Sequence, residues 1–288
     1  MIKLLALDLD GTVLNSRGEI PEANRIAIRE AERCGVLVTI ATGRRFRDAR
    51  PIGQQLDLNA PLITHNGALL KFASTMETVS FSLLQSEVSA EIIRVGREFG
   101  GDALLSVDPL GIGVMYYDNI SDDNFPLRKY VAWAEALHGE DLGSAVRRVP
   151  SLLEILPEND VIHIAFSGGC GPMADLSSVL DQELGDSVKI LSTVYPKTDF
   201  TLLDILPQGS SKASGLEKLA ELNGLTREEI MAIGDNFNDV DMLEYAGTPV
   251  IMGNADSALL GRDGFYPTAG CDENGVAEAI RRFILDEC

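Results

Sequence analysis

The sequence predicts an α/β protein, in which a doubly wound parallel-sheet core is interrupted by an inserted α+β domain. Near both ends of the chain, short runs that are almost wholly apolar alternate with amphipathic helical patterns. Such runs are typical of parallel strands that are buried on both faces. In the middle of the chain, polar residues alternate within the strands, which is typical of a half-exposed sheet. We therefore assign residues 1–82 and 194–288 to the core and residues 83–193 to the insert.

The N-terminal part alternates strands with helices. Pro21 can open the first helix and Gly35 can close it. The second helix runs from Arg45 to Leu56, and the predicted strands are Lys3–Leu9, Val36–Thr42 and the short Leu62–Ile63. A β-α-β-α-β order of this kind predicts a doubly wound parallel sheet.

The insert and the C-terminal part also alternate between helices and strands. In the insert we expect helices at Ser86–Phe99, Leu127–Leu137 and Met173–Leu184, and strands at Ala103–Val107, Gly113–Asp118, Val161–Ser167 and Val188–Ser192. We expect the helices to cover one side of that sheet. The core then resumes with strands at Phe200–Leu206, Ile230–Ile233 and Pro249–Met252, and with helices at Lys212–Asn223, Asp239–Tyr245 and Asn274–Leu285.

Composition excludes several classes of partner. The net charge of −20 argues against binding to nucleic acid or to an anionic membrane, because both require a basic face. No apolar run is long enough to span a bilayer. The four cysteines show no CxxC spacing, so we expect free thiols in a reducing cytoplasm, and we see no signal peptide. The oligomeric state stays open.

Polar residues follow the predicted buried strands. These residues are Asp8 and Asp10, Thr42, Asn66, and Asp235 with Asp239, while Lys212 lies at a predicted helix start. In a parallel sheet the carboxyl ends of the strands share one edge, where ligands bind. Gly11 allows the chain to turn there, since it has no Cβ to restrict φ. The sequence therefore predicts a charged site at this edge.

The residue types indicate phosphoryl transfer. Clustered carboxylates repel each other unless a cation is present, and oxygen ligands without His or Cys suit Mg²⁺ better than zinc. Thr42 and Lys212 add a hydroxyl and an ammonium that suit phosphoryl oxygens. In phosphoryl transfer the protein mostly positions groups and neutralises charge.

Each motif taken alone has a simpler interpretation. Asp-Gly-Thr and Asn66-Gly67 are common turns, Thr42 is a good helix N-cap, and Lys212 suits a solvated helix start. The interpretation as a site rests on all the motifs occurring together, in order, at the ends of predicted elements.

The chain resembles the haloacid dehalogenase superfamily of phosphohydrolases, in particular its Cof-type branch. The resemblance rests on four ordered motifs: DLDGT at Asp8–Thr12, ATGR at Ala41–Arg44, Lys212, and GDNFNDVDML at Gly234–Leu243. It implies a Rossmann-like core with a C2B-type cap as the insert. The chain has Ala213 where the family usually has glycine, and Asp204 can take the place of the acid that usually precedes Lys212.

The resemblance also implies roles for individual residues. Asp8 would be the nucleophile that forms an aspartyl-phosphate, and Asp10 the general acid and base. Magnesium would be held by Asp8, by Asp235 and by the backbone carbonyl of Asp10, with support from Asp239. The residues that would bind phosphate or substrate are Thr42, Gly43, Arg44, Asn66, Lys212 and Asn238.

We therefore expect a cytoplasmic, Mg²⁺-dependent phosphatase that acts on a small phosphorylated metabolite, such as a sugar phosphate. Two alternatives remain. A hexose phosphomutase would share the aspartyl-phosphate, and a receiver-like signalling domain would share the acid cluster, although it needs neither a cap nor Asp10. For His163, Lys197, Tyr116 and Tyr117 in the cap, packing or plain surface exposure is the simpler expectation.

Overall fold

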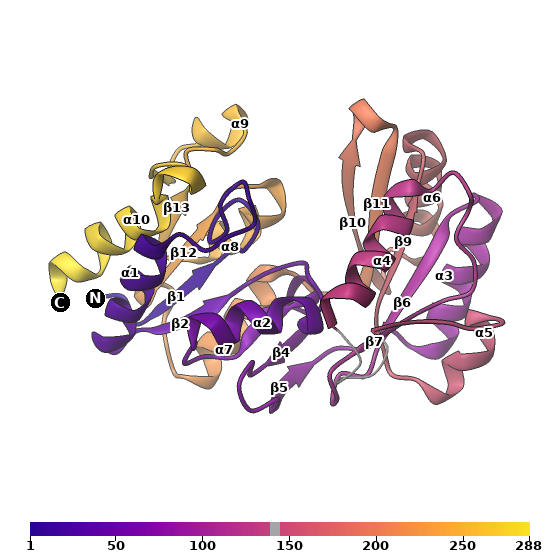
Figure 1. Cartoon of the computed structure of the whole chain (residues 1–288), viewed down its shortest axis with the longest axis horizontal. Coiled ribbons are helices and arrows are strands. Elements are labelled where there is room, and N and C mark those ends of the chain that lie inside the picture. Colours follow the sequence, from indigo (N-terminus) through magenta and orange to yellow (C-terminus); the bar gives the residue numbers. More distant parts are fainter. Residues whose placement is uncertain (139–144) are drawn as a thin grey trace. The chain divides into compact units, whose positions relative to one another are not determined.

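The computed structural model describes residues 1–138 and 145–288, which form two compact units (Figure 1). The first unit comprises Met1–Arg44, Ala49–Val79 and Ser211–Cys288. The second comprises Arg45–Asp48 and Ser80–Ser210. The second unit thus consists of two segments, one short and one long, that interrupt the sequence of the first.

The first unit is organised around a five-stranded sheet of order β14-β13-β12-β1-β2, in which every pair is parallel. Its strands are β1 (Leu4–Leu7), β2 (Leu37–Ile40), β12 (Ile230–Gly234), β13 (Thr248–Ile251) and β14 (Tyr266–Pro267). The β1 residues are fully buried, which fits their position in the middle of the sheet. The α/β fold class with a parallel-sheet core is confirmed, and the two-residue β14 is an addition to the prediction.

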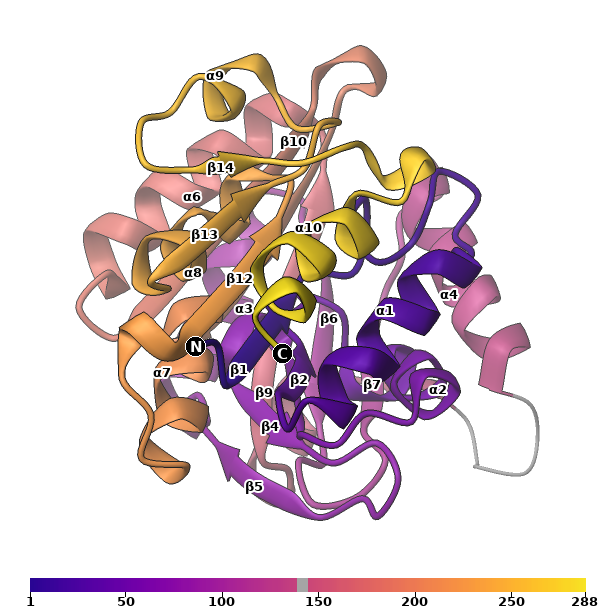
Figure 2. The same cartoon turned by 90° about the vertical axis from the view of Figure 1, so that its left-hand side faces the viewer.

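Helices cover both faces of this sheet. They are α1 (Glu22–Arg33), α2 (Phe46–Leu56), α7 (Lys212–Leu222), α8 (Val240–Tyr245), the short α9 (Ser257–Leu260) and α10 (Gly275–Phe283). Leu216 of α7 and Leu243 of α8 share an apolar cluster with Leu4 and Ile230 of the strands. On the opposite face α1 and α10 lie side by side (Figure 2).

The predicted third parallel strand has a mixed character. Ala41 and Ile63 form one parallel bridge, so the chain does continue the sheet beyond β2. β3 (Leu62–Thr64) then pairs in antiparallel fashion with β4 (Leu69–Lys71), in a three-stranded sheet completed by β5 (Thr78–Phe81). The 3₁₀ turn η1 (His65–Gly67) connects β3 to β4.

The second unit contains a six-stranded sheet of order β10-β11-β9-β6-β7-β8. Its strands are β6 (Asp102–Val107), β7 (Val114–Tyr117), β8 (Val146–Arg148), β9 (Val161–Gly168), β10 (Val188–Tyr195) and β11 (Phe200–Pro207). Its helices are α3 (Ser86–Glu98), α4 (Phe125–His138), α5 (Leu152–Ile155) and α6 (Cys170–Leu184). All the strand and helix positions predicted for the insert correspond to elements of this unit.

Two expectations about this sheet were wrong. The strand predicted over Phe200–Leu206 as part of the parallel core is β11, which pairs in antiparallel fashion with β10 and β9. The helices also do not all cover one face. Ile92 of α3 and Leu176 of α6 pack with Leu105 of β6, whereas Leu127 of α4 packs with Leu104. Because neighbouring residues of a strand point to opposite faces, α4 covers the other side.

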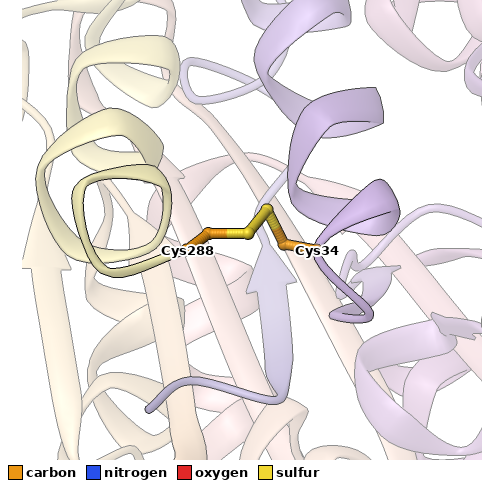
Figure 3. Close-up of a disulfide and its surroundings, with 2 residues drawn as sticks. All are labelled: Cys34 and Cys288. Atoms are coloured by element: carbon orange, nitrogen blue, oxygen red, sulfur yellow. A yellow bond between two sulfur atoms is a disulfide. The ribbon is translucent and has the colours of Figure 1, made fainter.

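A disulfide joins Cys34, at the end of α1, to Cys288 (Figure 3). This bond corrects the prediction of four free thiols, and only Cys170 and Cys271 remain free. It closes the contact between α1 and α10, where the amide of Ala277 also donates to Asn24 Oδ1 at 3.1 Å. Within the described ranges, every helix is too short or too polar to span a bilayer.

Candidate active site

The site begins where two neighbouring strands end. Asp8 directly follows β1 and Asp235 directly follows β12, and the Asp8 amide donates to the Ile233 carbonyl at 2.9 Å. Gly11 turns the chain after Asp8 with φ of +85°. A Cβ at Gly11 would lie 2.5 Å from Asp235 Oδ2. Glycine is required here both by the backbone conformation and by the close approach of Asp235.

Three carboxylates meet at this edge. One oxygen each of Asp8, Asp235 and Asp239 can be chosen so that all lie within 4.8 Å of one another. Asp239 reaches the group from the turn η5 (Phe237–Asp239), and its Oδ2 accepts hydrogen bonds from the Asp235 and Asn236 amides at 3.0 Å. Carboxylate oxygens alone are a donor set suited to a hard divalent cation such as Mg²⁺.

Lys212 enters the same group from the first residue of α7. Its buried ammonium lies 2.6 Å from Asp8 Oδ1 and 2.5 Å from Asp239 Oδ1. The start of α7 is fixed because Ser211 and Ser214 cap it reciprocally. Asp8, Asp239 and Lys212, predicted to share a site, thus share one hydrogen-bonded cluster, with Asp235 beside it.

The cluster holds more negative than positive charge. Burial, followed by the charge of Asp239, raises the pKa of Asp8 well above its usual value. The same two causes raise the pKa of Asp235 to about 6. Burial would lower the pKa of Lys212, but Asp239 and Asp8 together raise it above its usual value. One ammonium therefore does not balance three carboxylates, and the donor set fits a bound Mg²⁺.

Asp10 stands apart from this cluster. Its side chain is about half exposed and forms a bidentate pair with Arg44, at 2.8 Å from Nε and 2.5 Å from Nη2. Its carboxylate is therefore not one of the three that meet, in keeping with a metal contact through the backbone carbonyl alone. The pair places a cation beside the residue predicted as general acid and base.

Thr42, Gly43 and Asn66 form a second part of the edge. Asn66 is buried in the left-handed conformation, with φ of +49°, and its Oδ1 has no hydrogen-bond partner among the described residues. Its carboxamide lies about 3 Å from where a Cβ of Gly43 would be. Thr42 Oγ1 accepts a hydrogen bond from the Arg44 amide at 3.1 Å, but Thr42 does not cap a helix, because α2 begins only at Phe46. A strained, buried polar residue of this kind is common at functional sites.

Two further residues assigned from the sequence have different surroundings. Asn238 is exposed on η5 between two acids of the cluster. Asp204, proposed as the acid preceding Lys212, instead lies on β11 of the second unit, where its Oδ1 is 2.8 Å from His163 Nε2. Its hydrogen-bond partner is therefore a residue of the second unit, whereas the acids that contact Lys212 are Asp8 and Asp239.

Sequence reasoning gave no role to two residues that contact Asp235. Thr12 Oγ1 donates to Asp235 Oδ1 at 2.9 Å, and Asn254 Nδ2 lies 3.4 Å from Oδ2. Thr12 is part of the quoted DLDGT motif. Asn254 follows the predicted strand at Pro249–Met252, so its position after a buried strand was the available signal.

Comparison with known proteins places the chain in a family. The haloacid dehalogenase-like hydrolase family matches residues 5–280. A 5-amino-6-(5-phospho-D-ribitylamino)uracil phosphatase of Bacillus subtilis is 32% identical over 286 residues, covering 99% of this chain and 96% of that protein. A pyridoxal phosphate phosphatase of Escherichia coli is 30% identical over 262 residues, covering 90% and 91%. The crystal structure of a haloacid dehalogenase-like hydrolase from Bacteroides thetaiotaomicron superposes with a TM-score of 0.80 at 29% identity, covering 99% and 100%.

The chain therefore belongs to the haloacid dehalogenase-like hydrolase family. Within that family it groups with Cof-type phosphatases, which confirms the resemblance drawn from its four motifs and the expected class of phosphoric monoester hydrolase.

Proposed function

We propose that the protein is a Mg²⁺-dependent phosphatase that hydrolyses small phosphorylated metabolites through a phosphorylated Asp8. The buried cluster of three carboxylates around one lysine supports this proposal most strongly. Burying unbalanced acids is costly, so such an arrangement is expected where a ligand supplies the missing positive charge. When bound, Mg²⁺ supplies charge neutralisation for the phosphoryl group and for the carboxylates.

In the first step Asp8 attacks phosphorus, forming a bond between its carboxylate oxygen and phosphorus, and the ester oxygen departs with a proton from Asp10. Lys212 holds Asp8 in place, because its ammonium is 2.6 Å from Asp8 Oδ1. Thr42 and Asn66 border the edge where the transferring group is bound. Arg44 binds Asp10 in the free protein, and an incoming phosphate competes with Asp10 for that guanidinium.

In the second step Asp10 takes a proton from water, which attacks phosphorus and releases inorganic phosphate. The bond between phosphorus and Asp8 breaks, and the carboxylate of Asp8 is regenerated. The two acids need different surroundings for these roles. Asp8 is buried against Lys212, whereas Asp10 is about half exposed.

The relatives narrow the class of substrate. One is named for a uracil derivative that carries a phosphorylated ribityl chain, and another for pyridoxal phosphate. Both names describe a phosphate monoester of a small ring compound. We propose the same class for this chain, which includes the sugar-phosphate-like esters expected from the sequence. The cytoplasmic location stays a prediction, since the disulfide removes one of its arguments.

Hydrolysis of an aryl phosphate, with and without Mg²⁺, tests the reaction type. We expect turnover that is lost on chelation and falls by at least about a thousandfold in Asp8→Asn, as for removal of other nucleophiles. Asp102→Asn is a matched control, because it changes a buried aspartate of the second unit and should retain activity.

Activity that survives both chelation and Asp8→Asn would reject the proposal. A requirement for a sugar bisphosphate would instead indicate a phosphomutase. Once the reaction type is established, a panel of phosphorylated metabolites that includes the two compounds in the relatives' names would identify the substrate.

A further inference from the structure

Asn254 connects two parts of the candidate site that come from opposite ends of the chain. It lies three residues after β13, and its Nδ2 donates to the Gly11 carbonyl at 2.9 Å. The same nitrogen lies 3.4 Å from Asp235 Oδ2. One carboxamide thus contacts both the loop that follows Asp8 and the acid that follows β12.

The other side of this carboxamide is also held. Its Oδ1 accepts a hydrogen bond from the Cys271 amide at 2.8 Å. Next to it, the Gly253 amide donates to the Ala269 carbonyl at 3.1 Å. Although Asn254 is exposed, its donor and acceptor ends are therefore both fixed, which gives the side chain one orientation.

Each carboxylate oxygen of Asp235 has its own neighbouring donor. Thr12 donates to Oδ1 at 2.9 Å, and Asn254 lies near Oδ2. Gly11 lies so close to Asp235 that a Cβ there would be 2.5 Å from Oδ2, so a shift of the Gly11 loop toward Asp235 would displace this carboxylate. Residues that orient metal ligands in this way commonly affect metal affinity or activity by ten- to a hundredfold.

We propose that Asn254 is a positioning residue, which fixes the Gly11 loop and the carboxylate of Asp235 in the orientation needed to bind the divalent cation. This inference rests on the proposed function, because that function supplies the divalent cation. Asn254 acts through Asp235 and Gly11, and it therefore needs no contact with substrate.

Asn59 provides a matched control. It also joins two backbone segments through one carboxamide, donating from Nδ2 to the Val36 carbonyl at 3.0 Å and accepting from the Val38 amide at 2.8 Å. It lies in the same unit, beside the start of β2 and therefore at the opposite end of the sheet from the acids. Asn59→Ala removes an equivalent structural connection without touching the site.

The test compares Asn254→Ala, Asn59→Ala and the unaltered protein by three measurements. Backbone hydrogen exchange over residues 9–16 reports the loop without any metal, calorimetric titration with Mg²⁺ reports metal affinity without substrate, and aryl phosphate hydrolysis reports turnover. In Asn254→Ala alone, we expect faster exchange in the loop, Mg²⁺ affinity weaker by about tenfold or more, and a matching fall in turnover at low Mg²⁺.

Unchanged loop exchange and Mg²⁺ affinity in Asn254→Ala would overturn the inference, as would equal losses in Asn59→Ala. If the unaltered protein neither bound Mg²⁺ nor hydrolysed the ester, the proposed function would fail. The exchange measurement would still decide whether Asn254 holds the loop.

Discussion

Both units bury acidic side chains, but they surround them differently. In the second unit, the buried carboxylate of Asp102 accepts hydrogen bonds from the Ser121 amide and hydroxyl and from Asn124 Nδ2, at 2.8 to 3.0 Å. In the first unit, three carboxylates share one ammonium, and burial raises the pKa of both Asp8 and Asp235.

The difference separates a structural role from a functional one. A carboxylate surrounded by donors lowers the energy of one conformation and needs nothing further. Acids that repel one another store free energy that a bound cation can release, so they cost stability in the free protein. The crowding of several acids around one ammonium, rather than burial alone, distinguishes the two clusters.

Removing Lys212 should change the stability of the protein more than any other substitution considered. In Lys212→Met no cation separates Asp8 from Asp239, so we expect a loss of about 3–5 kcal/mol in the free energy of unfolding at pH 7.5 without metal. The acids are then harder still to ionise, so stability is retained at low pH and lost as pH rises. Urea unfolding at pH 5 and 7.5 measures this. An equal loss at both pH values would show that Lys212 acts through packing alone.

Asp102→Ala should lower the stability of the protein but leave its turnover almost unchanged. It leaves the donors of Ser121 and Asn124 without their acceptor, so we expect a loss of about 2–3 kcal/mol in the free energy of unfolding. Aryl phosphate turnover of the folded variant should stay within about twofold of the unaltered protein. Denaturant unfolding and initial rates measure the two quantities. A fall in turnover with unchanged stability would assign Asp102 to function.

The last prediction concerns Asp235 alone. Its pKa is raised to about 6 on folding, so the folded state binds the proton more tightly than the unfolded chain does. Its contribution to stability is therefore complete below about pH 4 and lost as pH rises through about 6. Without metal, the melting temperature of the unaltered protein should fall over this range relative to Asp235→Asn. A constant difference between them would contradict the shift.

Much of this arrangement could be predicted from local sequence patterns. The runs around β1, β2 and β12 are apolar on both faces, and each is followed by a polar residue, which placed Asp8, Thr42 and Asp235 at one edge. That rule concerns strand ends only. It could not show that Asp10 turns toward Arg44 rather than toward the other acids, because the pairing depends on the path of the Gly11 loop.

Other features depend on long-range pairing that no local pattern records. β11 is largely apolar, yet it joins the antiparallel sheet because it forms a hairpin with β10, which precedes it. Asp204 consequently faces His163 across neighbouring strands of that sheet. Cys34 and Cys288 are far apart in sequence, and only the packing of α1 against α10 brings them together.

The Cys34–Cys288 bond closes residues 34 to 288 into a covalent ring. A single cleavage by a protease anywhere between these two cysteines would open the ring but release no fragment until the disulfide is reduced. Nicked and intact chains should therefore have the same mass apart from one added water under oxidising conditions, and should separate on a gel only after reduction.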